Sequence, residues 1–116
     1  MKCIICGTRD INDYSVIIEA IKESNFKITE IVSGNAHGVD RMAERYAKEN
    51  NIPLHIFSAE WNIYGKYAGP IRNKKMIDFI LPDGYVIAIW DGKSKGTKNT
   101  IELAKTNNLN LYIKII

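Results

Sequence analysis

The sequence predicts one Rossmann-like α/β domain over residues 1–116, with about five strands in a mostly parallel sheet and helices on both of its faces. Apolar runs alternate with amphipathic stretches along the whole chain, which is the pattern of repeated strand–helix units. The apolar runs are nearly continuous, as expected of strands that are buried on both faces. A chain of 116 residues suits a single core, and no linker or internal repeat divides it.

The first half of the chain predicts three strands and two helices. Asp13 is suited to cap the first helix, because its carboxylate can accept a hydrogen bond from a first-turn N–H group. The second helix is expected to begin at Val39, directly after a glycine-rich turn. The expected ranges are residues 2–6, 30–33 and 54–57 for the strands, and 39–51 for the second helix.

The second half begins with a long, aromatic-rich connection over residues 58–69. Pro70 suits the first turn of a third helix, because proline lacks the N–H group that a first turn leaves unpaired. The Leu-Pro-Asp-Gly sequence of residues 81–84 ends that helix. A strand over residues 85–90, a helix over 98–107 and a strand over 109–116 complete the predicted fold.

The composition limits the partners and the compartment. A formal net charge of +3 favours anionic ligands but falls short of the basic stripe of a duplex-binding protein, which argues against nucleic acid. No apolar run approaches the ~20 residues that span a bilayer. The N-terminus also lacks the apolar core and cleavage site of a signal peptide. We therefore expect a cytoplasmic protein that has no membrane partner.

Cys3 and Cys6 are the two cysteines of the chain, and both lie on the first predicted strand. Residues three apart on a strand point to opposite faces, so these thiols cannot easily share a metal or close a disulfide. We interpret them as buried thiols in a reducing compartment, with a zinc or redox site as the less favoured alternative. We expect neither a metal site nor a cofactor.

Three glycine-rich turns follow predicted strands directly, and parallel strands bring such turns to one edge of a sheet. After the first strand, Gly7 permits close backbone approach, Thr8 offers a hydroxyl and Arg9 can bind a phosphate, although ordinary turns use the same residue types. The turn after the fourth strand lacks a full Walker pattern. It can still bind phosphate through backbone N–H groups and the hydroxyls of Ser94 and Thr97.

The turn over residues 33–41 leads into a helix N-terminus, where free N–H groups and the helix dipole attract anions. Asp40 lies in the first turn of this helix and either meets a ligand or complements the helix dipole. His37 is either an acid–base group or a solvent-facing loop residue, and the second interpretation is favoured.

The segment over residues 61–76 combines aromatic residues with a cluster of cations. Trp61 or a neighbouring aromatic residue can stack a base while the cations meet phosphates. Arg72 and Asn73 fall in the first turn of the third helix, and we expect them to clamp an anion at the sheet edge. The alternative is an aromatic cluster that closes the loop onto the core, with solvated lysines on the helix.

Taken together, these segments resemble the YspA-type, cpYpsA-related branch of the SLOG superfamily over nearly the whole chain. The resemblance implies a Rossmannoid domain that binds nucleotides or nucleotide-derived ligands. The superfamily includes the lonely-guy phosphoribohydrolases, whose Arg-x-x-x-Met pattern is matched by Arg72 and Met76. Where those enzymes carry their catalytic glutamate this chain has Thr100, which cannot act as an acid or base near neutral pH.

The leading hypothesis is a domain that senses or sequesters a nucleotide or nucleotide-derived phosphate ligand. The alternatives are a nucleotide N-glycosidic hydrolase that uses Asp40 or Asp91, and a single-stranded DNA-binding domain like the DNA-processing protein A relatives. Analogy with relatives predicts a homodimer. The expected ligand-binding residues are Gly7, Thr8, Arg9, Ser33, Gly34, Gly38, Asp40, Trp61, Arg72, Asn73, Trp90, Ser94, Gly96 and Thr97.

Overall fold

Five parallel strands form one sheet in the computed structural model, which describes residues 1–116. The order across the sheet is β3-β2-β1-β4-β5, and all four neighbouring pairs are parallel. The predicted α/β class is therefore confirmed, with a sheet that is entirely rather than mostly parallel. The strands are β1 (Lys2–Gly7), β2 (Glu30–Ser33), β3 (Leu54–Ile56), β4 (Tyr85–Trp90) and β5 (Asn110–Ile115).

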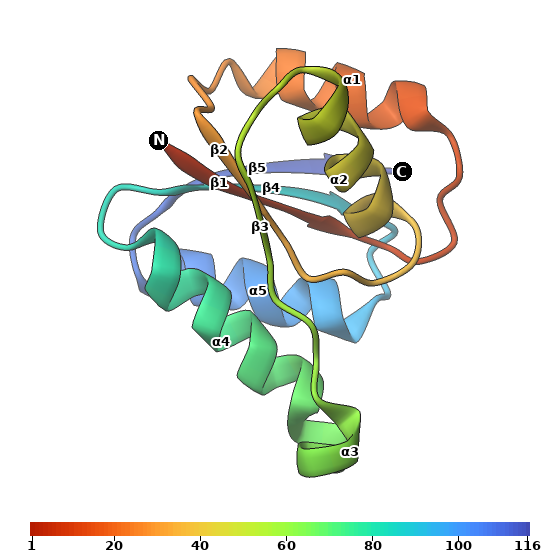
Figure 1. Ribbon diagram of the computed structural model, residues 1–116, viewed down its shortest axis with the longest axis vertical. Coiled ribbons are helices and arrows are strands. Elements are labelled where there is room, and N and C mark those ends of the chain that lie inside the picture. Colours follow the sequence, from red (N-terminus) through yellow and green to blue (C-terminus); the bar gives the residue numbers. More distant parts are fainter.

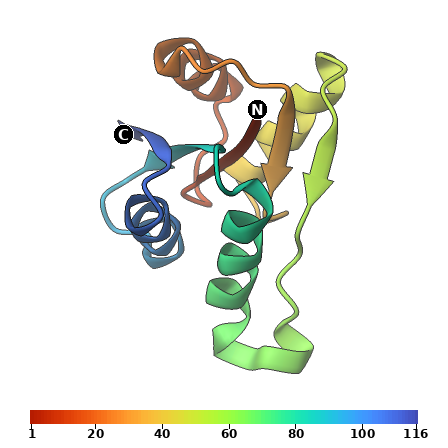
Figure 2. The same cartoon turned by 90° about the vertical axis from the view of Figure 1, so that its left-hand side faces the viewer.

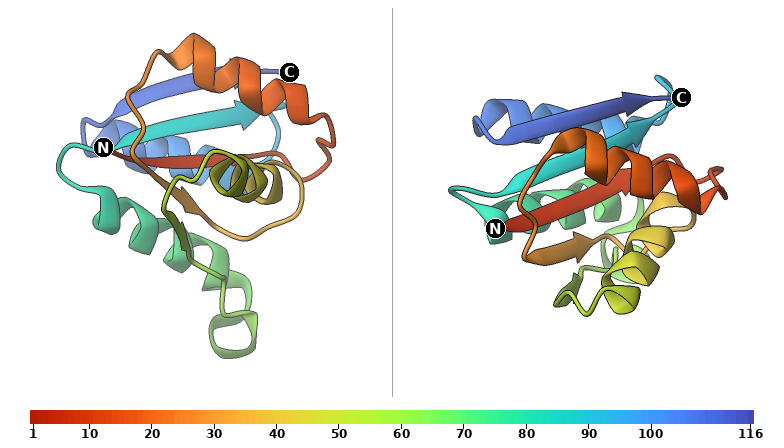
Figure 3. Two further views of the ribbon diagram at one scale, coloured as in Figure 1. Left: turned by 45° about the horizontal axis from the view of Figure 1, so that its top comes forward. Right: turned by 90° about the horizontal axis from the view of Figure 1, so that it is seen from above.

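Helices cover both faces of the sheet (Figure 1, Figure 3). On one face lie α1 (Tyr14–Ser24) and α2 (Val39–Glu49), and on the other lie α4 (Ala68–Ile80) and α5 (Lys95–Thr106). Asp13 caps α1 as predicted, because its Oδ1 accepts from the backbone N–H of Ser15 at 3.0 Å. None of these helices has the length and apolar composition needed to cross a bilayer.

The two cysteines belong to opposite core layers, as the alternation of the strand predicts. Cys3 packs with α1 and α2, whereas Cys6 packs with α4 and α5. Both thiols are free and buried, and burial raises the pKa of each well above its ordinary value. The placement agrees with a core role for both side chains.

The connection before α4 contains more helical structure than its composition predicts. A short helix, α3 (Trp61–Tyr64), and a 3₁₀ turn, η1 (Gly65–Tyr67), together form what we call the α3–η1 arm, which projects beyond the sheet (Figure 2). Helix α5 likewise begins three residues earlier than expected, because Ser94 caps it by accepting from the N–H of Thr97. A side-chain cap sets the start of α5, whereas the arm begins with backbone bonds from the N–H groups of Ile63 and Tyr64 to the carbonyl oxygen of Glu60.

The strand order reverses between β1 and β4, since the chain builds outward from β1 to β3 on one side and from β4 to β5 on the other. In an open parallel sheet, the loops that leave the strands at such a point diverge to opposite faces and leave a crevice. The loops after β1 and β4 therefore frame the place where a ligand site is expected.

Candidate functional site

A cavity of about 630 Å³ opens at the carboxyl ends of β1 and β4. This volume falls in the range of small-molecule sites. Its wall is formed by the loops after β1, β2 and β4, the starts of α2 and α5, the α3–η1 arm and the first half of α4. The predicted site residues at this wall are Gly7, Thr8, Arg9, Asp40, Trp61, Arg72, Asn73, Asp91, Ser94, Gly96 and Thr97.

Four predicted residues lie elsewhere. Gly34 lines a neighbouring cavity of about 270 Å³, while Ser33, Gly38 and Trp90 line neither. The Ser33 hydroxyl is completely buried and donates to Glu44 Oε2 at 2.7 Å, which turns it away from any ligand. The Trp90 indole N–H donates to the carbonyl oxygen of Ser94 at 3.0 Å and so supports the loop before α5.

Gly38 is required by the packing of two loops. Its φ of 78° is in the region that favours glycine, and an added Cβ would lie 2.5 Å from the carbonyl oxygen of Arg9. Gly7 meets a similar constraint, since a Cβ there would lie 2.4 Å from the carbonyl oxygen of Ile89. Both glycines therefore let neighbouring backbone segments approach each other at the cavity edge.

The loops after β1 and β4 are tied together by polar contacts. Thr8 Oγ1 accepts from the N–H of Asp91 at 3.2 Å, which joins the two loops directly. Asp91 Oδ1 accepts from the N–H groups of Lys93 at 2.8 Å and Ser94 at 2.9 Å. These bonds lower the pKa of Asp91, so its carboxylate remains ionised near neutral pH and shapes the loop.

The N-terminus of α5 forms one wall of the cavity. The Ser94 hydroxyl accepts a hydrogen bond from the N–H of Thr97. The N–H groups of Lys95 and Gly96, in the first turn of α5, have no partner within the protein. The exposed side chains of Lys93 and Lys95 flank this helix end and also line the cavity. Unpaired N–H groups, the helix dipole and two ammonium groups together form an arrangement that can attract an anion.

Arg72 is held between α4 and the loop after β2. Its Nη1 donates to the carbonyl oxygen of Gly34 at 2.6 Å, and its Nε donates to Asn73 Oδ1 at 2.8 Å. Asn73 in turn donates to Asn99 Oδ1 at 2.9 Å, which links α4 to α5. Replacing Arg72 by alanine would break the first two bonds, so this side chain supports the local fold as well as lining the cavity.

Asp40 is the buried carboxylate of the cavity wall, with only 5% of its surface exposed. Its Oδ2 accepts from the N–H of Ala36 at 3.2 Å, and burial raises its pKa to about 6. Gly34 lets the side chains of Asp40 and Arg72 lie close to the backbone of the loop after β2. A Cβ at this position would lie 2.8 Å from Asp40 Oδ2 and 2.9 Å from Arg72 Nη1. The carboxylate can thus change protonation state close to neutral pH.

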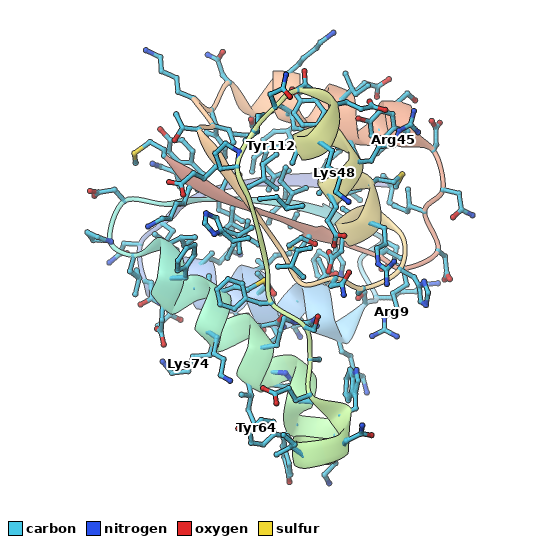
Figure 4. All side chains as sticks on the ribbon, in the orientation of Figure 1. Arg9, Arg45, Lys48, Tyr64, Lys74 and Tyr112 are labelled. Atoms are coloured by element: carbon cyan, nitrogen blue, oxygen red, sulfur yellow. The ribbon has the colours of Figure 1, made fainter.

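The α3–η1 arm closes one side of the cavity with Trp61 and Lys66. Trp61 is 50% exposed, so its ring is not the core plug that one interpretation of the segment predicts. Figure 4 shows Arg9 beside the start of α5 and Tyr64 out on the arm. Tyr64 faces a separate hollow of about 200 Å³ and does not line the main cavity.

Several residues at the cavity wall had been given no ligand role from the sequence, among them Cys6, Ala36 and Asn99. Cys6 directly precedes Gly7 near the end of β1, and this position in the sequence could have indicated that it lines the cavity. Asn99 lies three residues after Gly96, which places it on the same face of α5. Ala36 contributes through its backbone N–H, for which side-chain patterns give no signal.

The fold and the cavity define a Rossmann-like α/β domain with a polar site at the point where the strand order reverses. The chain belongs to the YspA, cpYpsA-related SLOG family, whose family model matches residues 1–64. The family suggested by the motifs is thus confirmed, and membership supports a nucleotide-related function in general.

One curated relative is the Gene 61 protein of Mycobacterium phage D29, which is 26% identical over 113 residues. That similarity covers 90% of this chain and 88% of the phage protein. No solved structure gives a significant match.

Proposed function

We propose that this domain binds a phosphate-bearing nucleotide derivative, with the phosphate at the N-terminus of α5. The observation that carries the proposal is the convergence of five cationic side chains on one cavity that also contains the start of α5. Three acidic residues, Asp10, Asp40 and Asp91, also line the wall, so the cationic side chains outnumber the carboxylates five to three. The cations are Arg9, Lys66, Arg72, Lys93 and Lys95.

The remaining features suit the other parts of a nucleotide. Trp61 also lines this cavity and presents a half-exposed aromatic surface on which a base can stack. Asp40 lines the same cavity, and we assign its carboxylate to the sugar. Such a cavity suits a domain that senses or sequesters its ligand.

A double substitution, Lys93→Ala with Lys95→Ala, is expected to weaken AMP binding by at least about tenfold, because it removes two charge-assisted contacts to the phosphate. Isothermal titration calorimetry with AMP and adenosine measures this effect, and the wild-type protein should prefer AMP strongly. The matched control is Lys98→Ala with Lys105→Ala, which removes the same charge from α5 without touching the cavity wall.

The control variant should bind AMP within about twofold of the wild-type protein, since distant exposed charges are screened by salt. Equal losses in the two double variants would show that general charge, rather than this site, governs binding. If neither AMP nor any other nucleoside phosphate binds, and no nucleotide copurifies by mass spectrometry, the proposal is rejected.

A second candidate function is hydrolysis of an N-glycosidic bond, and the buried Asp40 favours it. A carboxyl group with a pKa near 6 at the cavity wall can donate a proton to a departing base. Thr100 offers no such group, since it is 1% exposed and its hydroxyl donates to the carbonyl oxygen of Gly96 at 3.4 Å. Incubation with AMP, NAD and cyclic ADP-ribose, followed by chromatography for released base, separates a hydrolase from a binding domain.

A further inference from the structure

The two carboxylate oxygens of Asp40 have different environments. Oδ2 accepts from the N–H of Ala36 at 3.2 Å, whereas Oδ1 receives no hydrogen bond from any protein group. No buried side-chain polar atom of the chain lacks a partner, so Oδ1 is not sealed in the core. Since the residue is only 5% exposed and lines the main cavity, this oxygen faces the cavity.

The charged groups around Asp40 leave this acceptor available. Arg9 and Arg72 favour its ionised form through space, but neither forms an ion pair with it within 4.0 Å. Glu44, one helical turn further along α2, opposes ionisation and is itself held by the Ser33 hydroxyl at 2.7 Å. Asp40 Oδ1 therefore faces the cavity with no protein donor, and it can accept hydrogen bonds from a ligand there.

We propose that Asp40 Oδ1 accepts hydrogen bonds from the vicinal hydroxyls of a ribose, which makes the cavity selective for ribonucleotides over deoxyribonucleotides. This inference rests on the proposed function. A phosphate is a poor partner for this oxygen, because two anions repel, and the N–H groups at the start of α5 offer the phosphate a better place. A nucleotide's other donors are the sugar hydroxyls and, in some bases, an exocyclic amino group.

The sugar is the better of these two donors on chemical grounds. A vicinal diol presents two adjacent O–H groups, and a carboxylate oxygen can accept more than one of them. The base is drawn instead toward the aromatic surface of Trp61, whose half-exposed ring lines the same cavity. If the phosphate binds at the start of α5 and the base stacks on Trp61, the sugar is the part of the nucleotide that remains to contact Asp40.

The test is a calorimetric comparison of AMP, 2′-deoxy-AMP and 3′-deoxy-AMP with the wild-type protein. We expect each deoxynucleotide to bind at least about tenfold more weakly than AMP, because each loses a hydrogen bond to a charged acceptor. Asp40→Asn keeps the side-chain shape and the acceptor for the Ala36 N–H. In that variant the affinity for AMP should fall to that for the deoxynucleotides. The preference for AMP over either deoxynucleotide should then be less than about threefold.

Each outcome bears on a different step. Equal binding of AMP and both deoxynucleotides to the wild-type protein overturns this inference but leaves the proposed function standing. A preference for ribose that survives in Asp40→Asn also overturns the assignment to this residue. If IMP, which lacks the amino group of AMP, binds as weakly as deoxy-AMP, the carboxylate reads the base rather than the sugar, and the inference fails. Binding of no nucleotide at all rejects the proposed function itself.

Discussion

Replacing Gly38 by alanine is expected to destabilise the protein by about 3 kcal/mol or more, although sequence reasoning assigned this residue to the ligand. Two effects add. Its φ of 78° with ψ of −123° strains any residue with a side chain, and the new Cβ would lie 2.5 Å from the carbonyl oxygen of Arg9 and 2.7 Å from that of Thr8. Backbone atoms cannot move aside without separating the loop after β1 from the start of α2. Chemical denaturation measures the free energy of unfolding.

Gly65→Ala is the matched control for this prediction. Gly65 has a similar backbone conformation, with φ of 56° and ψ of −133°, but an added Cβ would meet no atom within 4 Å. We therefore expect a loss of only about 1–2 kcal/mol from backbone strain alone. If the two variants lose equal stability, strain rather than the contact between the loops accounts for the effect at Gly38.

Asp40→Asn is expected to stabilise the ligand-free protein by up to about 3 kcal/mol at pH 8, although it should impair ribonucleotide binding. Burial raises the pKa of Asp40 to about 6, so the native state disfavours the ionised form. In the unfolded chain the group loses its proton near its ordinary pKa of 3.8. Asparagine keeps the neutral shape and removes the penalty of burying a charge.

The sign of the pH dependence follows from these two pKa values. Below about pH 4 both states hold the proton, and Asp40 imposes no penalty relative to asparagine. Between about pH 4 and pH 6 the unfolded state loses its proton first, so wild-type stability falls, and above pH 6 the penalty is constant. Denaturation of both proteins at pH 4, 6 and 8 should therefore show a gain that grows with pH.

Asp78→Asn provides the control, because Asp78 is exposed and paired with Lys74 at 3.1 Å. It should show no gain in stability as the pH rises. An Asp40→Asn variant that is less stable than wild type at pH 8 would indicate that Arg9 and Arg72 stabilise the carboxylate by more than its burial costs. A buried ionisable group that serves a functional site commonly lowers the free energy of unfolding, as we expect for Asp40.

Much of the fold was predictable from the sequence because its signals are local. Apolar runs located all five strands, and the alternation within β1 placed Cys3 and Cys6 in opposite core layers. The cap at Asp13 followed from residue type and position alone. The early start of α5 and the α3–η1 arm were less predictable, since capping and short turns leave little periodicity to detect.

By itself the sequence determined a parallel α/β sheet, the family, and the edge at which the glycine-rich turns gather. Only the tertiary structure decided the role of each polar residue at that edge: Ser33 turns inward to Glu44, Trp90 holds the loop before α5, and Asp40 keeps one oxygen toward the cavity. The physical reason is that periodicity reports contacts within one element, whereas a side chain's role depends on contacts between segments that are distant in sequence.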